Sequence, residues 1–219
     1  MKIRLDLSVN SFIESLILSD FLIFFSLGLL APIFAIFISE QIAVGDGLRV
    51  IGLATSIYWI VRCLVAPPLS RFMDKTDGER DEFAFMFFGY LLAAILPLFY
   101  IVASEPWHIY LLQGLLAIAF SMAIPGWRIL FTNHLDNGKT GYEWSLEDVS
   151  IGLSTALSAY VGAVIAERFG FATLFVSVSV VGFMGTLLIL PMRHHIKARK
   201  EVLKIRKKRH LGGTVASPK

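Results

Sequence analysis

The chain has 219 residues, of which 56% are hydrophobic and only 17% are charged, and its formal net charge is +3. Soluble domains usually carry about 25% charged residues, and the long apolar stretches of this chain lack the polar face that a surface helix of a soluble domain needs. The composition therefore excludes a soluble globular protein and predicts an all-α membrane protein. The single cysteine, Cys63, excludes an internal disulfide and a thiolate metal site, and we expect neither a metal nor a cofactor.

Six stretches are apolar enough, over about 20 residues each, to span a bilayer as helices. In chain order they cover about residues 10–39, 50–69, 83–103, 107–127, 149–166 and 171–192. The first is too long for the apolar region of a cleaved signal peptide, so we expect it to remain as a membrane helix. The sequence predicts a six-transmembrane-helix bundle over residues 1–192, followed by a basic tail over residues 193–219.

The basic residues predict the orientation of this bundle. Most of the 20 Lys and Arg residues lie in the two termini and in the loops 70–82 and 128–148, which are on one side of the predicted bundle. Because cytoplasmic loops carry the excess of Lys and Arg, both termini are predicted to be cytoplasmic, in a multi-pass protein of the plasma membrane. The tail is expected to contact anionic lipids of the inner leaflet, and nucleic acid is not an expected partner.

Several polar residues lie inside the predicted spans, where they are costly and often functional. Arg62 lies deep in the second span beside Tyr58, and the acids Asp20 and Glu14 lie in the first span. Arg62 and Asp20 could form a static ion pair between two helices, or they could work in a water-filled cavity, and the sequence leaves both interpretations open. The candidate residues for a cavity, for substrate binding or for proton coupling are Asp20, Glu14, Arg62, Tyr58, Gln113 and Ser121.

A stripe of small residues marks one face of the fifth predicted helix. Ser150, Ser154, Ser158 and Gly162 recur every four residues. Small residues let two membrane helices approach closely, because packing drives helix association in lipid. The stripe therefore predicts a close helix contact.

The loop after the second predicted helix reads SRFMDKTDGER. It resembles a degenerate form of the signature loop of the major facilitator superfamily, which is roughly Gly-x-Leu-Ala-Asp-Arg-x-Gly-Arg-Arg. Asp74 matches the acid of the motif, Lys75 the base that follows it, Gly78 its second glycine and Arg80 a terminal base, while Ser70 stands where glycine is usual. The segment ERFGFATLF between the last two spans is also similar to the family, and the resemblance covers about residues 10–192.

This resemblance implies a fold and an assembly. Members usually have twelve helices in two halves that are parallel repeats, so this chain would be equivalent to one half and would work as a parallel homodimer. Helices 1 and 4 would line the cavity, helices 2 and 5 would form the contact between halves, and helices 3 and 6 would face lipid. The stripe Ser150, Ser154, Ser158 and Gly162 is therefore assigned to the dimer interface.

The resemblance also implies a cytoplasmic gate, because the motif aspartate of the family contacts the start of a helix in the other half. Asp74 would meet the start of the partner's fifth helix, whose partial positive charge favours an acid. Glu147 and Asp148 already occupy that helix start, and they could instead pair with Arg71, Lys75 or Arg128. The predicted gate residues are Arg71, Asp74, Lys75, Arg80, Arg128, Glu147 and Asp148.

The function implied is secondary transport of a small solute by alternating access, with Asp20 as the first candidate for proton coupling and Glu14 as the second. The alternative is a membrane scaffold or assembly factor that transports nothing and needs a partner protein. No acid, base and nucleophile lie within reach of one another at a suitable depth, so an enzyme is not expected.

Overall fold

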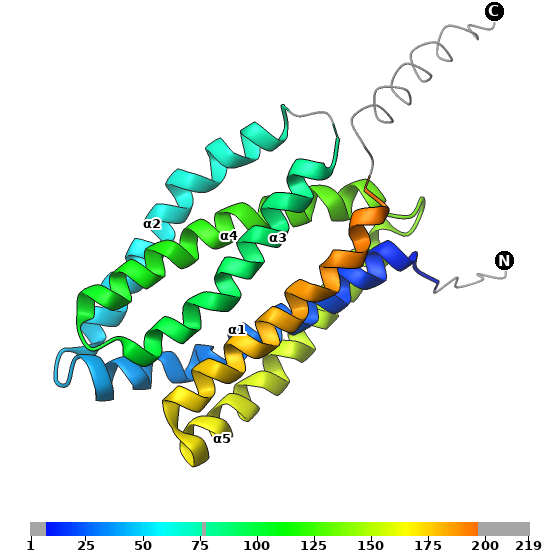
Figure 1. Ribbon diagram of the computed structural model, residues 1–219. Coiled ribbons are helices and arrows are strands. Elements are labelled where there is room, and N and C mark those ends of the chain that lie inside the picture. The colour runs from blue at the N-terminus through cyan, green and yellow to red at the C-terminus, as the bar shows by residue number, and fades with distance from the viewer. Residues whose placement is uncertain (1–7, 76–77, 197–219) are drawn as a thin grey trace, which may run out of the picture.

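The computed structural model describes residues 8–75 and 78–196, and all of the regular structure in this part of the chain is helical. The helices form an elongated bundle in which they run up and down along one common direction (Figure 1). The elements are α1 (Ser11–Phe37), the π-helical turn η1 (Ile38–Ile42), α2 (Gly47–Met73), α3 (Arg80–Ile95), the 3-10 helix η2 (Leu96–Val102), α4 (Pro106–His134), α5 (Thr140–Ile189) and the 3-10 helix η3 (Leu190–His194). The expectation of an all-helical membrane bundle is confirmed.

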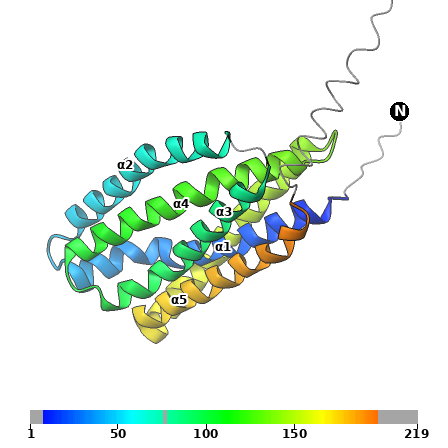
Figure 2. The same cartoon turned by 45° about the horizontal axis from the view of Figure 1, so that its top comes forward.

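Five helical segments of the described chain are long and apolar enough to cross a membrane. The fifth contains α5, which has 50 residues and is interrupted at Gly170, where φ is 81°. Positive φ is accessible to glycine at little cost, and the chain turns back on itself at this point. We call residues 140–169 the first arm of α5 and residues 171–189 its second arm; the two arms lie side by side in both views (Figures 1 and 2).

α2, α4 and the first arm of α5 extend further than the apolar stretches that predicted them. Polar contacts define two of their ends: the Asn10 side chain accepts a hydrogen bond from the amide of Ile13 at the start of α1, and Glu105 and His108 form a capping box at the start of α4. At its other end α4 continues to His134, seven residues past the predicted boundary at 127. Hydropathy marks the apolar layer, whereas backbone hydrogen bonds continue wherever the residues permit a helix.

The helices differ widely in how much of their surface is buried against other helices. α1 makes its most extensive contacts with α5, and α4 packs against both α2 and α3. Of the most apolar window of each segment, 39% to 44% is buried in four cases but only 11% in α2. α2 therefore lies at an edge of the bundle, where most of its surface has no neighbour within the described chain (Figure 2).

The two ends of the described chain lie at the same end of the bundle (Figure 1). There the side chain of Asn10 donates a hydrogen bond to the carbonyl of His134, and Met192 packs in the same cluster as Phe12. We call this the N-terminal end of the bundle. Most of the predicted basic tail, residues 197–219, lies outside the described residues.

Candidate functional site

Two carboxyl groups from different helices face each other inside the bundle. Asp20 of α1 is 3% exposed and Glu147 of the first arm of α5 is 2% exposed. The Tyr90 hydroxyl, from α3, donates a hydrogen bond of 3.0 Å to Oδ1 of Asp20. The Glu147 carboxyl lies close enough to Asp20 for the two carboxyl groups to interact, by charge and by a shared hydrogen bond, and no other group of the described chain hydrogen-bonds to its oxygens. We call Asp20 and Glu147 the acid pair.

Burial of the acid pair lowers the stability of the folded protein. A buried carboxylate is normally paired with a cation or held by several hydrogen bonds, and two carboxylates at one site repel each other. The nearest opposing charge is Arg128, which is close enough to act on Tyr90 but is itself exposed. No three His, Cys, Asp or Glu side chains of the described residues converge to hold a metal ion. The arrangement is suited to binding and releasing a proton between helices α1, α3 and α5.

Arg62 lies apart from the acid pair. Its Nη1 donates a hydrogen bond of 2.8 Å to the Tyr58 hydroxyl, and the guanidinium carbon is 5.4 Å from the centre of the Trp59 ring. None of its contacts in the described chain is with a carboxylate. The ion pair with Asp20 is therefore not formed, because α1 and α2 touch only sparingly and Asp20 points into the core toward Tyr90.

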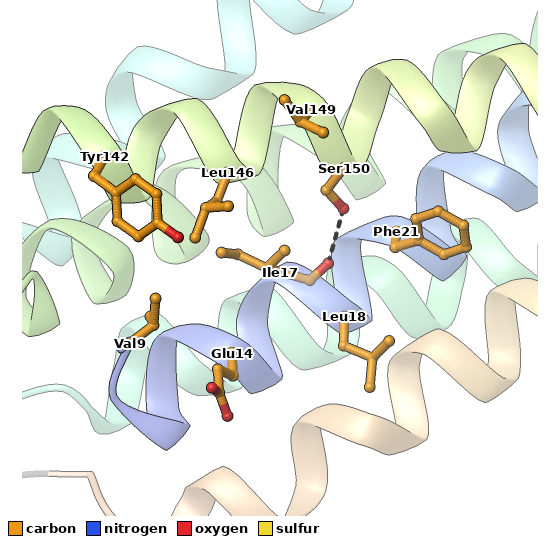
Figure 3. A pocket seen from close by; sticks show the side chains of 9 residues that line it. All are labelled: Val9, Glu14, Ile17, Leu18, Phe21, Tyr142, Leu146, Val149 and Ser150. Carbon is orange, nitrogen blue, oxygen red and sulfur yellow. Dashed lines mark hydrogen bonds between the residues drawn. The ribbon is translucent and has the colours of Figure 1, made fainter. Parts of the chain in front are cut away.

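Glu14 lies in an open groove between α1 and the first arm of α5 (Figure 3). The groove has a volume of about 480 Å³, and Glu14 is its one acidic side chain. Apart from Glu14, Tyr142 and Ser150, the groove is lined by the apolar side chains of Val9, Ile17, Leu18, Phe21, Leu146 and Val149. Glu14 is exposed, whereas Asp20 is buried and accepts a hydrogen bond from Tyr90.

The two polar residues predicted on α4 are engaged in local contacts. The Gln113 side chain is half-buried, and its Nε2 lies 3.4 Å from the Tyr100 hydroxyl of η2. Ser121 is fully buried, and its hydroxyl donates to the carbonyl of Ala117 in the same helix. The burial of Ser121 fits a close helix contact, and a role for it in lining a cavity stays a prediction.

The predicted gate network is also not formed within the described chain. Arg71, Asp74, Lys75, Arg80, Arg128 and Asp148 are exposed. Glu147, the exception, belongs to the acid pair in the core. Asp74 occupies the C-cap position of α2, and residues 76–77 of the motif loop lie outside the described residues. The contact expected of Asp74 would be made with a second copy, so the gate stays a prediction.

A different polar cluster joins the helices at the N-terminal end of the bundle. His134 Nε2 lies 3.7 Å from Oε2 of Glu79, and these side chains are only 13% and 4% exposed. The imidazole stacks on Phe12 of α1 with a centroid distance of 3.7 Å. Its Nδ1 is 2.9 Å from the carbonyl oxygen of Leu130, which can only accept, so Nδ1 carries a proton. We call Glu79, His134 and Phe12 the latch.

The latch was not predicted, because Glu79 was one acid among several in a charged loop and His134 an isolated histidine in another. It becomes an ion pair when the imidazole carries its second proton on Nε2. It ties the start of α3 to the end of α4 and to α1.

Replacing His134 with alanine is expected to lower the free energy of unfolding by about 1–3 kcal/mol, because it removes a buried polar partner of Glu79 and the ring stacked on Phe12. Thermal unfolding of the purified protein in detergent, followed by circular dichroism, measures the loss. Asn137→Ala, an exposed change in the adjacent loop, is the matched control. Equal melting temperatures for the two variants would contradict a structural role for the latch.

The stripe on α5 is buried inside the chain. Ser154 and Ser158 are 0% exposed, and the Ser150 hydroxyl donates a hydrogen bond of 3.3 Å to the carbonyl of Ile17 (Figure 3). A Cβ atom on Gly162 would collide with the backbone of Leu29. The predicted close helix contact is present, but its partner is α1 of the same chain, so the assignment of Ser150, Ser154, Ser158 and Gly162 to a dimer interface is corrected.

Comparison with known proteins gives one match. Residues 16–214 match the family model described as the Major Facilitator Superfamily. The chain matches no curated protein and no solved structure. The matched region begins in α1 and includes every helix described after it.

Proposed function

Because the chain belongs to the major facilitator superfamily, whose members are membrane transporters, we propose that it moves a small solute across the membrane by alternating access. The acid pair is the site that supports this proposal best. A protein that only holds helices together gains nothing from two unneutralised acids in its core, whereas a transporter can use them to take up and release a proton.

The chain crosses the membrane six times in this proposal, with both termini in the cytoplasm. Each arm of α5 would be one crossing, and the turn at Gly170 would lie on the outer side. An even number of crossings is supported by the two described ends lying at the same end of the bundle. The orientation is supported by the Lys and Arg residues of the loops and termini at that end, and the plasma membrane is the proposed location.

A second six-helix half would complete the cavity, and a second copy of this chain in parallel orientation is the simplest source. The support is the unpacked surface of α2, where Trp59 is 55% and Leu64 69% exposed. Gly52 of α2 and Gly152 of α5 both face open space, which leaves room for another helix backbone. A two-fold axis along the membrane normal would place the same surface of both copies in contact.

Cys63 provides a direct test, because it is exposed on α2 and is the one cysteine of the chain. We expect a membrane-impermeant methanethiosulfonate to label Cys63 in proteoliposomes, since an alternating-access transporter holds water at that depth. Native mass spectrometry in nanodiscs should give a dimer of the 24.4 kDa chain. Cys63→Ser is the control for labelling. A monomer whose Cys63 reacts only with membrane-permeant reagents would contradict the proposal and favour a scaffold.

A further inference from the structure

The position of the Arg62 guanidinium is unusual for an arginine in a membrane helix. Such a side chain normally extends toward the nearer membrane surface. Arg62 lies about 16 Å along the helix axis from Met73, the end of α2 at the N-terminal end of the bundle. Its guanidinium instead folds back one turn toward Gly47, onto Tyr58 and Trp59. The charge is therefore held near the middle of α2.

No acid of the described chain neutralises this charge. The buried acids Asp20 and Glu147 face each other in the core. α4, the helix that contacts α2 most extensively, contains no Asp or Glu, and no carboxylate of the described chain forms an ion pair with Arg62.

The donors of Arg62 suit one class of ligand. Only Nη1 has a hydrogen-bond partner in the described chain, the hydroxyl of Tyr58, so most of the guanidinium fork remains available. This fork binds a carboxylate through two parallel hydrogen bonds. The Trp59 ring, 55% exposed, forms an apolar surface beside it.

We propose that Arg62, Tyr58 and Trp59 recognise the carboxylate of a small organic anion with an apolar body, and that this anion belongs to the substrate class of the transporter. The inference rests on the proposed function, because the second half would enclose the ligand against α2. The guanidinium binds the carboxylate, the Tyr58 hydroxyl fixes the guanidinium, and the apolar body lies against Trp59.

Benzoate and benzylamine test this class, since they share an aromatic ring and carry opposite charges at neutral pH. The purified protein in nanodiscs is titrated with each compound while tryptophan fluorescence is recorded. Trp59, one of the four tryptophans of the chain, lies in the site, and the part of the signal lost in Trp59→Phe reports on it. We expect saturable binding of benzoate and none of benzylamine. Arg62→Gln should weaken benzoate binding at least about tenfold, and Arg62→Lys should weaken it less, because it keeps the charge but loses the fork.

Arg49→Gln is the matched control, because Arg49 is an exposed arginine at the other end of α2, and its affinity for benzoate should equal that of the wild type. Equal affinity in Arg62→Gln, or equal binding of benzylamine, would overturn the proposal. If Cys63 is labelled from water and benzoate does not bind, the substrate class is wrong while the transporter proposal stands. If Cys63 is not labelled and benzoate does not bind, both proposals are wrong.

Discussion

Replacing Gly162 with valine is expected to destabilise the folded protein by about 3 kcal/mol or more, at the upper end of the cost of overpacking a core. A Cβ atom at this position would lie 2.7 Å from the carbonyl carbon and 2.8 Å from the Cα of Leu29. Both are backbone atoms of α1, so no side-chain rotation relieves the clash, and α1 and α5 have to separate. Thermal unfolding in detergent should show a large drop in melting temperature.

Gly152→Ala is the control for this effect, because Gly152 lies in the same arm of α5 and an added Cβ atom there meets nothing within 4 Å. Alanine is the better helix former by about 1 kcal/mol, so this variant should be as stable as the wild type or slightly more stable. If Gly162→Val unfolded at the wild-type temperature, the contact between α1 and the first arm would not be as close as described.

Replacing Asp20 with asparagine is expected to abolish solute accumulation driven by a proton gradient and to leave the fold intact. Asparagine keeps the Oδ1 atom that accepts the hydrogen bond from Tyr90, but it can no longer bind or release a proton. Uptake into proteoliposomes under an inward proton gradient measures the effect, with benzoate as the first solute tried. Uptake into protein-free liposomes is subtracted, because neutral benzoic acid crosses lipid by itself. Exchange of the solute at equal pH on both sides should persist, because it needs no net proton movement.

Glu167→Gln is the matched control, since Glu167 is an exposed acid near the turn at Gly170 and should not affect accumulation. Glu147→Gln should weaken the response to the proton gradient, because it removes the second carboxyl of the acid pair. Undiminished accumulation in Asp20→Asn would remove Asp20 from the coupling mechanism and leave the acid pair without a role in transport.

The sequence by itself determined the class of the protein. Long apolar runs with few charges can be stable only as membrane helices, because a helix satisfies its own backbone hydrogen bonds in lipid. The motif loop around Asp74 and the segments after it were enough to indicate the major facilitator superfamily, which the family match over residues 16–214 confirms. The stripe from Ser150 to Gly162 predicted a close helix contact, since small residues permit one whatever the partner is.

Only the tertiary structure decided which residues meet. Asp20 lies beside Tyr90 and Glu147 rather than Arg62, and the stripe packs on α1 rather than on another copy. Glu79 and His134 form a contact between the start of α3 and the end of α4 that the sequence did not predict. Hydropathy and helical periodicity give the depth and the face of each residue on its own helix. The crossing of the helices determines which faces touch, and it is set by side-chain packing between segments far apart in the chain.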